Sequence, residues 1–387
     1  SRQTVQYQYV LYSTVVNPRI SILYAPMAVV FGLRMPRAVH AIARRTATRA
    51  SRGLQTVTTA PHSLLSVRGG TQGGSVMVRT NMETDIATVD SSPAGQTNVS
   101  VHSGPCSASD VHVRDDSPSD LTIGIPGAFS VDVERGEGRG DVVVDGWLEG
   151  TVAVATASGD VSVKTVRGML TTLATGEGDV SAELIDGDAQ LSTGRGSISM
   201  EKFQGKVLGM HTGGGTITAR AIYGEDVTLS AKDGDVHIKF LHADKAVVDV
   251  DSGAVRIDAI DGSARVNTTG SGASITVQLS DGVESLHLNA GGDIAVLMPD
   301  HLPVRGEGRG VAVQCDEGLA SRPAPGEPQE GVIFLEPHGS DTATDVGSTR
   351  GATEAVNQAV HVVAISTAGR VHFKKHSWLD RFKLPST

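Results

Sequence analysis

The sequence is poor in aromatic residues, in cysteine and in long apolar runs, and each shortage excludes a class of protein. Phe, Trp and Tyr make up 4% of the 387 residues, too few to fill a wide core, whereas there are 46 glycines. Cys106 and Cys315 match no metal or redox spacing, and two thiols cannot build a disulfide framework in so long a chain. No apolar run approaches the ~20 residues of a membrane-spanning helix. This composition favours many short strands joined by tight turns.

Acidic residues are absent from the first 82 positions, which contain ten arginines. Within them, residues 27–56 are rich in Arg, Ala, Ser and Thr and can form a basic amphipathic helix, as mitochondrial transit peptides do. We therefore expect residues 1–60 to be an upstream extension with a transit peptide, and the protein to lie in the mitochondrial matrix; an ordinary basic tail is the alternative. The remaining body is strongly acidic, so we expect it to bind neither nucleic acid nor anionic lipid.

Glycine recurs through the middle of the chain with a nearly constant step. A first column advances by 18 or 19 residues, and a second follows it by about nine positions in most units. The first column is Gly140, Gly159, Gly178, Gly196, Gly215, Gly234, Gly253 and Gly272, with Gly292 one residue late; the second is Gly150, Gly168, Gly187, Gly205, Gly224, Gly262 and Gly282. Each unit therefore has two strands and two turns.

Apolar residues fall into register with these glycines. Counted from the first glycine, they occupy positions +2, +4 and +7 and the position five before the next glycine, with Trp147 opening the +7 column. Alternation at +2 and +4 is typical of a strand with one buried face. A single unit cannot offset the entropy of ordering its own backbone, so the units must stack. We predict an all-β fold, a parallel β-solenoid (β-helix-like) of about 19-residue coils with two strands per coil.

The chain on either side of the regular repeat is less orderly. We predict a solenoid over residues 74–317 with irregular N-terminal coils, and strands at 75–79, 97–102, 111–114, 121–125 and 129–133. Residues 318–357 are rich in Pro, Gly, Ser and Thr and are expected to form a low-complexity loop with one strand-like segment at 332–335. Residues 358–387 are expected to form a C-terminal strand pair and a cap.

A phrase recurs in which a turn is followed by Asp-Val and alternating apolar residues. It reads ATASGDVSV at 155–163 and ATGEGDVSA at 174–182, and it is led in by LTIGIPGAFSVDVERGEGRGDVVV at 121–144. These segments resemble the putative-adhesin domain family, a domain of unknown function, and Ser377, Trp378 and Leu379 are similar to the ending of eukaryotic, mitochondrially targeted members. The resemblance covers residues 74–384. It implies a β-solenoid and brings no established catalytic residues.

Asp141, Asp160 and Asp179 follow the turn glycine on three consecutive units and form the candidate metal site. Stacked carboxylates suit Ca²⁺, which prefers hard oxygen ligands. Alternatively, each Asp accepts a backbone N–H at its own turn. Because Ser197, Thr216 and Ala254 take the same place elsewhere, we favour the second interpretation and expect no metal or cofactor.

Two function classes fit a parallel solenoid. A carbohydrate-active β-helix enzyme, a polysaccharide lyase or hydrolase, needs carboxylates that converge in a groove, and the short coils of 140–298 have no long loops to wall one. GEGRG at 136–140 and 306–310 precedes no helix, against a phosphate loop. His211, His237, His242 and His287 lack metal-ligand spacing. We therefore expect a non-catalytic scaffold or protein-interaction module that binds a protein partner, with the carbohydrate-active enzyme as the alternative.

Overall fold

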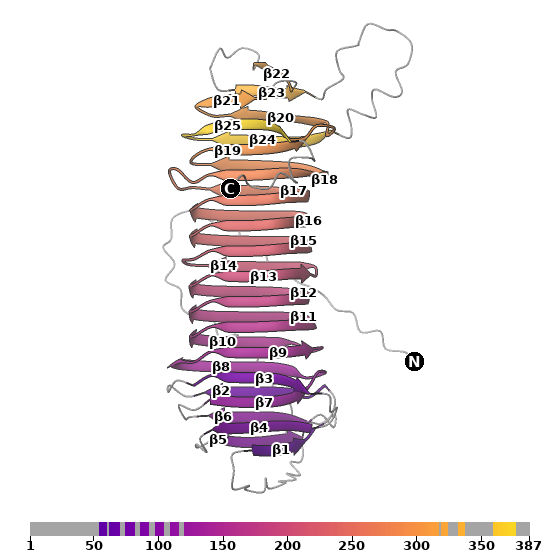
Figure 1. Cartoon of the computed structure of the whole chain (residues 1–387), viewed down its shortest axis with the longest axis vertical. Helices are drawn as coiled ribbons and strands as arrows, with labels where there is room; N and C mark the ends of the chain where they lie inside the picture. Colours follow the sequence, from indigo (N-terminus) through magenta and orange to yellow (C-terminus); the bar gives the residue numbers. More distant parts are fainter. Residues whose placement is uncertain are drawn as a thin grey trace, which may run out of the picture. The chain divides into compact units, whose positions relative to one another are not determined.

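The computed structural model describes residues 54–59, 62–69, 74–81, 86–92, 97–103, 109–115, 120–316, 319–323, 332–336 and 359–376. They belong to one compact unit, Thr46–Thr387. Their strands join in a single 25-stranded sheet in which most pairs are parallel (Figure 1), and these residues form no helix. The prediction of an all-β parallel solenoid is confirmed. Most of the expected extension and transit peptide, residues 1–53, lies outside the described residues.

Each regular coil stacks in register on the coil before it. Six of the strands run unbroken through the second turn, for 14 to 17 residues, and pair with both neighbouring coils. Val161 pairs with Val180, for example, and Leu173 with Leu191. The strands of this region are β9 (Val142–Leu148), β10 (Val152–Ser158), β11 (Val161–Glu177), β12 (Val180–Arg195), β13 (Ile198–Gln204), β14 (Val207–Thr212), β15 (Ile217–Asp233), β16 (Val236–Ser252), β17 (Val255–Thr268), β18 (Ile275–Ala290) and β19 (Ile294–Pro299).

The apolar columns lie inside the coils, with one exception. The +2, +4 and +7 residues and those of the second strand are buried along the regular stack. Trp147, placed by the sequence in the +7 column, is instead 47% exposed, and Leu148 takes its place with no exposure. The extra residue is Gly146, whose φ of 115° forms a bulge and shifts the pairing of β9 with β11. The shift turns Trp147 to the outside.

The N-terminal coils stack out of sequence order. The coil formed by β2 and β3 inserts between a later coil, β6 and β7, and the next one, β8 and β9. Their bounds are β2 (Leu64–Gly69), β3 (Val76–Asn81), β6 (Ser109–Asp115), β7 (Asp120–Pro126) and β8 (Ser130–Arg139). The stacked sheet therefore begins before residue 74, the expected start of the solenoid.

Antiparallel strands close the N-terminal end on both faces of the stack. On one face β4 (Ile86–Ser92) pairs antiparallel with β7 and carries β1 (Leu54–Thr58) on its other side. On the other face β5 (Thr97–Ser103) pairs antiparallel with β6. A reversed strand breaks the parallel pattern that another coil would need in order to add to the stack, so these strands act as caps.

The C-terminal coil is also inserted out of order (Figure 1). β24 (Val360–Ser366) lies between β18 and β20 (Val304–Arg309), and β25 (Arg370–His376) lies between β19 and β21 (Ala312–Cys315). The expected strand pair is thus a parallel coil and not a hairpin. The region expected to be a loop contains two further strands, β22 (Ala320–Pro323) and β23 (Val332–Glu336). β23 pairs antiparallel with β20, and β22 pairs antiparallel with β23. The predicted cap after His376 lies outside the described residues.

Candidate functional site

The first turn of each coil is held by a column of close-packed glycines. Gly178 has a φ of 144°, and a Cβ on it would lie 2.3 Å from the carbonyl oxygen of Gly159 in the coil before. The column continues through the inserted coils, because Gly74 meets Gly140 at one end and Gly369 lies between Gly292 and Gly310 at the other. At Gly178 both the close contact and the positive φ require glycine, whereas at Gly140 and Gly369 the close contact alone does. This requirement accounts for the glycine repeat.

The three candidate aspartates lie on neighbouring coils, where each one caps the next. Asp141 Oδ1 accepts a hydrogen bond from the backbone N–H of Asp160 at 3.0 Å, and Asp160 Oδ1 accepts one from Asp179 at 2.8 Å. Asp179 Oδ1 in turn accepts from Ser197 at 2.7 Å. Each carboxylate thus accepts an N–H of the following turn and not one of its own turn, so the aspartates link neighbouring coils where the sequence predicted a local contact. In the part of the chain that the structure describes, no three His, Cys, Asp or Glu side chains are placed to hold a metal ion.

Buried threonines close the same turn from inside. Thr175 Oγ1 donates to the carbonyl oxygen of Gly159 at 2.9 Å, and Thr193 Oγ1 donates to that of Gly178 at 2.8 Å. Thr212 repeats the contact with Gly196, and Ser366 repeats it with Gly292 in the inserted C-terminal coil. Each threonine hydroxyl joins the end of a coil to its own start, and Ser366 joins the inserted coil to the turn that lies before it in the stack. The first turn therefore has a complete structural explanation.

The second turn is where large apolar side chains face solvent. Of seven large hydrophobic residues that are exposed in the described chain, five lie at or next to the second turns of the coils between residues 140 and 224. Met169 is 87% exposed and Tyr223 is 39% exposed. We call this group the second-turn edge; it consists of Trp147, Met169, Leu170, Val207 and Tyr223. Such a gathering on one edge is typical of a surface that binds another molecule.

A shallow groove of about 560 Å³ runs along the second-turn edge. Its floor is a column of four glycines, and Met169 and Tyr223 stand among its walls. The floor residues are Gly168, Gly187, Gly205 and Gly224. A Cβ on Gly187 would lie 1.7 Å from the carbonyl oxygen of Gly168, and one on Gly205 would lie 2.3 Å from that of Gly187, so stacking forbids side chains at these two positions. The consequence is a strip of bare backbone between two rows of side chains.

Charged residues of the groove are mostly paired across coils. Arg167 Nε lies 3.7 Å from Asp186 Oδ2, and its guanidinium stacks 5.2 Å from the Trp147 ring centre. Lys206 Nζ lies 3.3 Å from Glu225 Oε1. Asp188 differs, because its carboxylate accepts hydrogen bonds from two backbone N–H groups, those of Lys206 and Val207, at 3.2 and 3.0 Å. Its negative charge is therefore left without a cationic side chain among the described contacts.

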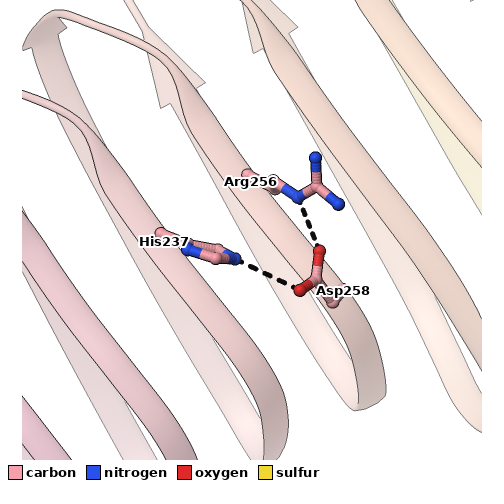
Figure 2. A network of polar contacts seen from close by, with 3 residues as sticks. All are labelled: His237, Arg256 and Asp258. Carbon is pink, nitrogen blue, oxygen red and sulfur yellow. Dashed lines mark hydrogen bonds and ion pairs between the residues drawn. The ribbon is translucent and has the colours of Figure 1, made fainter. Parts of the chain in front are cut away.

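Figure 2 shows a polar network between two neighbouring coils, in which His237 of β16 meets Arg256 and Asp258 of β17. Arg256 Nε donates to Asp258 Oδ1 at 2.7 Å, and His237 Nε2 lies 3.1 Å from Asp258 Oδ2. Burial raises the pKa of Asp258, but the hydrogen bonds from Arg256 and His237 outweigh it, so the net pKa is lowered. These contacts join His237 on β16 to Asp258 on β17 and so link two neighbouring coils.

The other histidines and the GEGRG segments also have structural places. His242 pairs with Asp261 of the next coil at 2.9 Å, and His211 is exposed on β14. His287 faces His361 with ring centres 5.9 Å apart, and burial, then the positive charges of His361 and Arg265, lower the pKa of His287. Both GEGRG segments run along strands β8 and β20 into a first-turn glycine. They are strand ends and not ligand loops.

Sequence reasoning identified the first turn and missed the second-turn edge. The aspartate column was visible because Asp recurs at one position, whereas the edge residues share no repeat position. A signal was present in Met169 and Leu170, which follow the second-turn glycine Gly168, and in Tyr223, which precedes Gly224. Met169 follows its turn glycine directly, at the position where three other coils have Asp188, Lys206 and Glu225. Of the two cysteines, Cys315 is half-buried at the end of β21, and Cys106 lies outside the described residues.

Comparison with known proteins finds a match to one family model over part of the chain. Residues 186–306 match the model of the family Toastrack DUF4097. The Toastrack DUF4097 match runs from the second half of β12 to β20, so it contains most of the groove but neither Trp147 nor Met169. No curated protein matches the chain. A helix long and apolar enough to cross a membrane was not found among the described residues.

One solved structure is similar over much of the chain. It is the crystal structure of a "putative cell adhesion protein from Clostridium sporogenes", with 9% sequence identity and a TM-score of 0.18. The similarity covers 84% of this chain and 99% of that one. Two folds that superpose so poorly support no argument from one to the other, and nothing is carried over. The Toastrack DUF4097 match and the geometry of the coils remain the basis for a function.

Proposed function

We propose that this protein is a non-catalytic β-solenoid scaffold that binds a partner protein through its second-turn edge. The observation that carries the proposal is the gathering of exposed apolar side chains there, on coils whose outward positions elsewhere are mostly small, polar or charged. A rigid stack holds these side chains at fixed spacing, which lowers the entropy cost of binding. Aromatic residues and Met are enriched in the cores of protein interfaces.

A non-catalytic role is supported by what the polar clusters do. The first-turn aspartates cap backbone N–H groups, and the His237 network links coils. Asp186 and Asp188, the two carboxylates of the groove, are engaged by Arg167 and by backbone N–H groups. A glycosidase needs a free pair that flanks the scissile bond. Nothing in this geometry favours the carbohydrate-active alternative.

The site of action that we propose is the mitochondrial matrix. Its support is the Arg-rich, acid-free composition of residues 27–56, which is typical of transit peptides. The acidic remainder of the chain fits a protein that has been separated from this basic leader. Immunofluorescence of the tagged full chain, together with protease protection in isolated mitochondria, tests the location independently of the interaction.

The interaction is tested by comparing two double variants of the full chain. Met169→Ser with Tyr223→Ser changes the second-turn edge, and Val311→Ser with Ile365→Ser changes two exposed hydrophobic residues elsewhere. Each tagged protein is used for affinity purification from the source cells, with mass spectrometry of the co-purified proteins. We expect the edge variant to lose a set of partners that the wild type and the control variant retain. Identical sets of proteins with all three baits would contradict the proposal.

A further inference from the structure

The groove of the second-turn edge extends along the stack over four coils. Its floor of four stacked glycines spans three steps between coils, roughly 14 Å at the ~4.8 Å spacing of paired strands. The side chains of Met169, Gln204, Lys206 and Tyr223 line the groove beside this floor. At ~3.3 Å per residue, about four or five residues of extended chain match that length. A wide ligand would rest on the walls and leave the floor empty.

The walls of the groove present apolar and acidic groups near one another. Met169 and Tyr223, at different coils along the groove, are both exposed, and Tyr223 is steadied by Phe240 with ring centres 5.4 Å apart. Between them along the stack lie Asp186 and Asp188. Asp186 has Arg167 as a partner and Lys206 has Glu225, whereas Asp188 has no cationic partner among the described ion pairs; the ammonium of Lys202 lies 5.8 Å from the centre of the Tyr223 ring. The groove therefore offers one carboxylate for a cation, flanked by apolar contacts.

The electrostatic field of the whole body has the same sign. Because ten of the 33 Lys and Arg residues lie in residues 1–82, only 23 remain in residues 83–387 to oppose all 43 Asp and Glu. A field of this sign attracts cations and repels nucleic acids and acidic glycans. The groove and its surroundings are thus complementary to a basic ligand.

Resting on the function proposed above, we infer that the groove binds an extended segment of a partner protein in which Lys or Arg alternates with apolar residues. A cationic side chain of the segment pairs with the carboxylate of Asp188. Neighbouring apolar side chains pack on Met169 and Tyr223, and the peptide backbone lies over the glycine floor. Alternation suits this arrangement because successive side chains of an extended chain point to opposite sides. The basic residue and the apolar residues supply specificity at separate contacts.

Three pools of fluorescent heptapeptides test this inference against the full chain. Each pool alternates a mixture of Leu, Val, Met and Phe with Lys and Arg in the first pool, Asp and Glu in the second, and Ser and Asn in the third. Fluorescence polarisation measures binding at low and high salt. We expect the basic pool to bind at least about tenfold more tightly than the others, and its affinity to fall with added salt.

Two variants with a matched control locate the binding. Asp188→Asn keeps the oxygen that accepts the N–H groups of Lys206 and Val207 but removes the charge, so it should weaken the basic pool roughly three- to fivefold without changing stability. Met169→Ser with Tyr223→Ser should weaken it about tenfold or more. Asp233→Asn makes the same charge change at an exposed first-turn position outside the groove and should leave binding unchanged.

The possible outcomes separate this inference from the proposed function. Equal binding of the three pools, or no binding of any, overturns the choice of a basic segment. Binding of the basic pool that survives both groove variants overturns the choice of the groove. If the partners captured from cells still depend on Met169 and Tyr223 in either case, the interaction edge stands and only its ligand is wrong. If they do not depend on these residues, the proposed function fails as well.

Discussion

The first and second turns of each coil both use stacked glycines, yet only the first turn is fixed by repeated side-chain contacts. Glycine, a capping Asp or Ser and a buried Thr recur there on coil after coil, and the inserted C-terminal coil repeats the set with Gly369, Asp293 and Ser366. The described contacts of these Asp, Ser and Thr side chains join one coil to the next or the end of a coil to its own start. The second turn shares only its glycines and differs from coil to coil in the residues around them.

This difference separates stability from recognition. A turn that matches its neighbours above and below tolerates few changes, because the loss of a shared contact leaves a carbonyl or an N–H without its partner. A turn that needs only a glycine floor leaves the flanking side chains free to change. In this chain those positions hold Trp147, Met169 and Tyr223. Substitutions at the first turn should therefore reduce stability, and substitutions of side chains at the second-turn edge should reduce binding.

The largest effect is expected at the first-turn glycine Gly215. It has a φ of 139°, and a Cβ there would lie 2.2 Å from the carbonyl oxygen of Gly196. Gly215→Ala should lower the free energy of unfolding by more than about 3 kcal/mol, through strain and displacement of the coil. A Cβ on its neighbour Gly214 would meet nothing within 4 Å, so Gly214→Ala should change stability by less than about 0.5 kcal/mol. Urea denaturation of both variants checks the contrast, and equal costs would refute the role of the glycine column.

A smaller effect is expected at the buried threonines that donate hydrogen bonds to first-turn carbonyl groups. Thr193→Val keeps the shape of the side chain but leaves the Gly178 carbonyl oxygen without its 2.8 Å hydrogen bond, at a cost of about 1–2 kcal/mol. The reciprocal change, Val250→Thr, introduces a hydroxyl at the same place in a coil that lacks one. It should cost less than Thr193→Val, because the turn carbonyl of Gly234 offers an acceptor. Thermal unfolding measures the loss of stability in each variant. A larger loss in Val250→Thr than in Thr193→Val would show that the hydroxyl does not stabilise the turn.

The regular coils were predictable from sequence because each column of residues has one physical cause. Stacked glycines have no room for a Cβ, and inward positions bury apolar side chains, so both recur at the coil period. The bulge at Gly146 was missed because one inserted residue shifts only the pairing that follows it, which exposes Trp147. The order of the end coils was not predictable, since β2 and β24 have the same alternating pattern as their neighbours and only long-range pairing decides where they insert. The second-turn edge was missed because its residues share no position in the repeat.

Substitutions at the first-turn aspartates, Asp141, Asp160 and Asp179, should reduce stability less than substitutions at the threonines. Asp179→Ala removes the acceptor for the Ser197 N–H, an exposed contact, and should cost about 0.5–1 kcal/mol. Asp179→Asn retains an acceptor oxygen and should be nearly neutral. The same pair of variants separates capping from metal binding, because Ca²⁺ ligation depends on the carboxylate charge. A calcium-dependent rise in the unfolding temperature that Asp179→Asn abolishes would favour the metal site instead.

The smallest effect is expected from pH, and it should arise outside both turns. No histidine takes part in the described contacts that hold the first turns, so acidification from pH 8 to 5 should leave them intact. His287 is different, because burial and the charges of His361 and Arg265 lower its pKa in the folded state. A histidine with a lowered folded pKa contributes full stability above its unfolded pKa of about 6.5, and this contribution is lost as the pH falls from that value through the lower folded pKa. Because the side chain is largely exposed, the loss should amount to a few tenths of a kcal/mol. His287→Gln should remove this pH-dependent contribution. The difference in unfolding free energy between wild type and variant should therefore change between pH 7.5 and 5. A constant difference would show that His287, His361 and Arg265 do not interact.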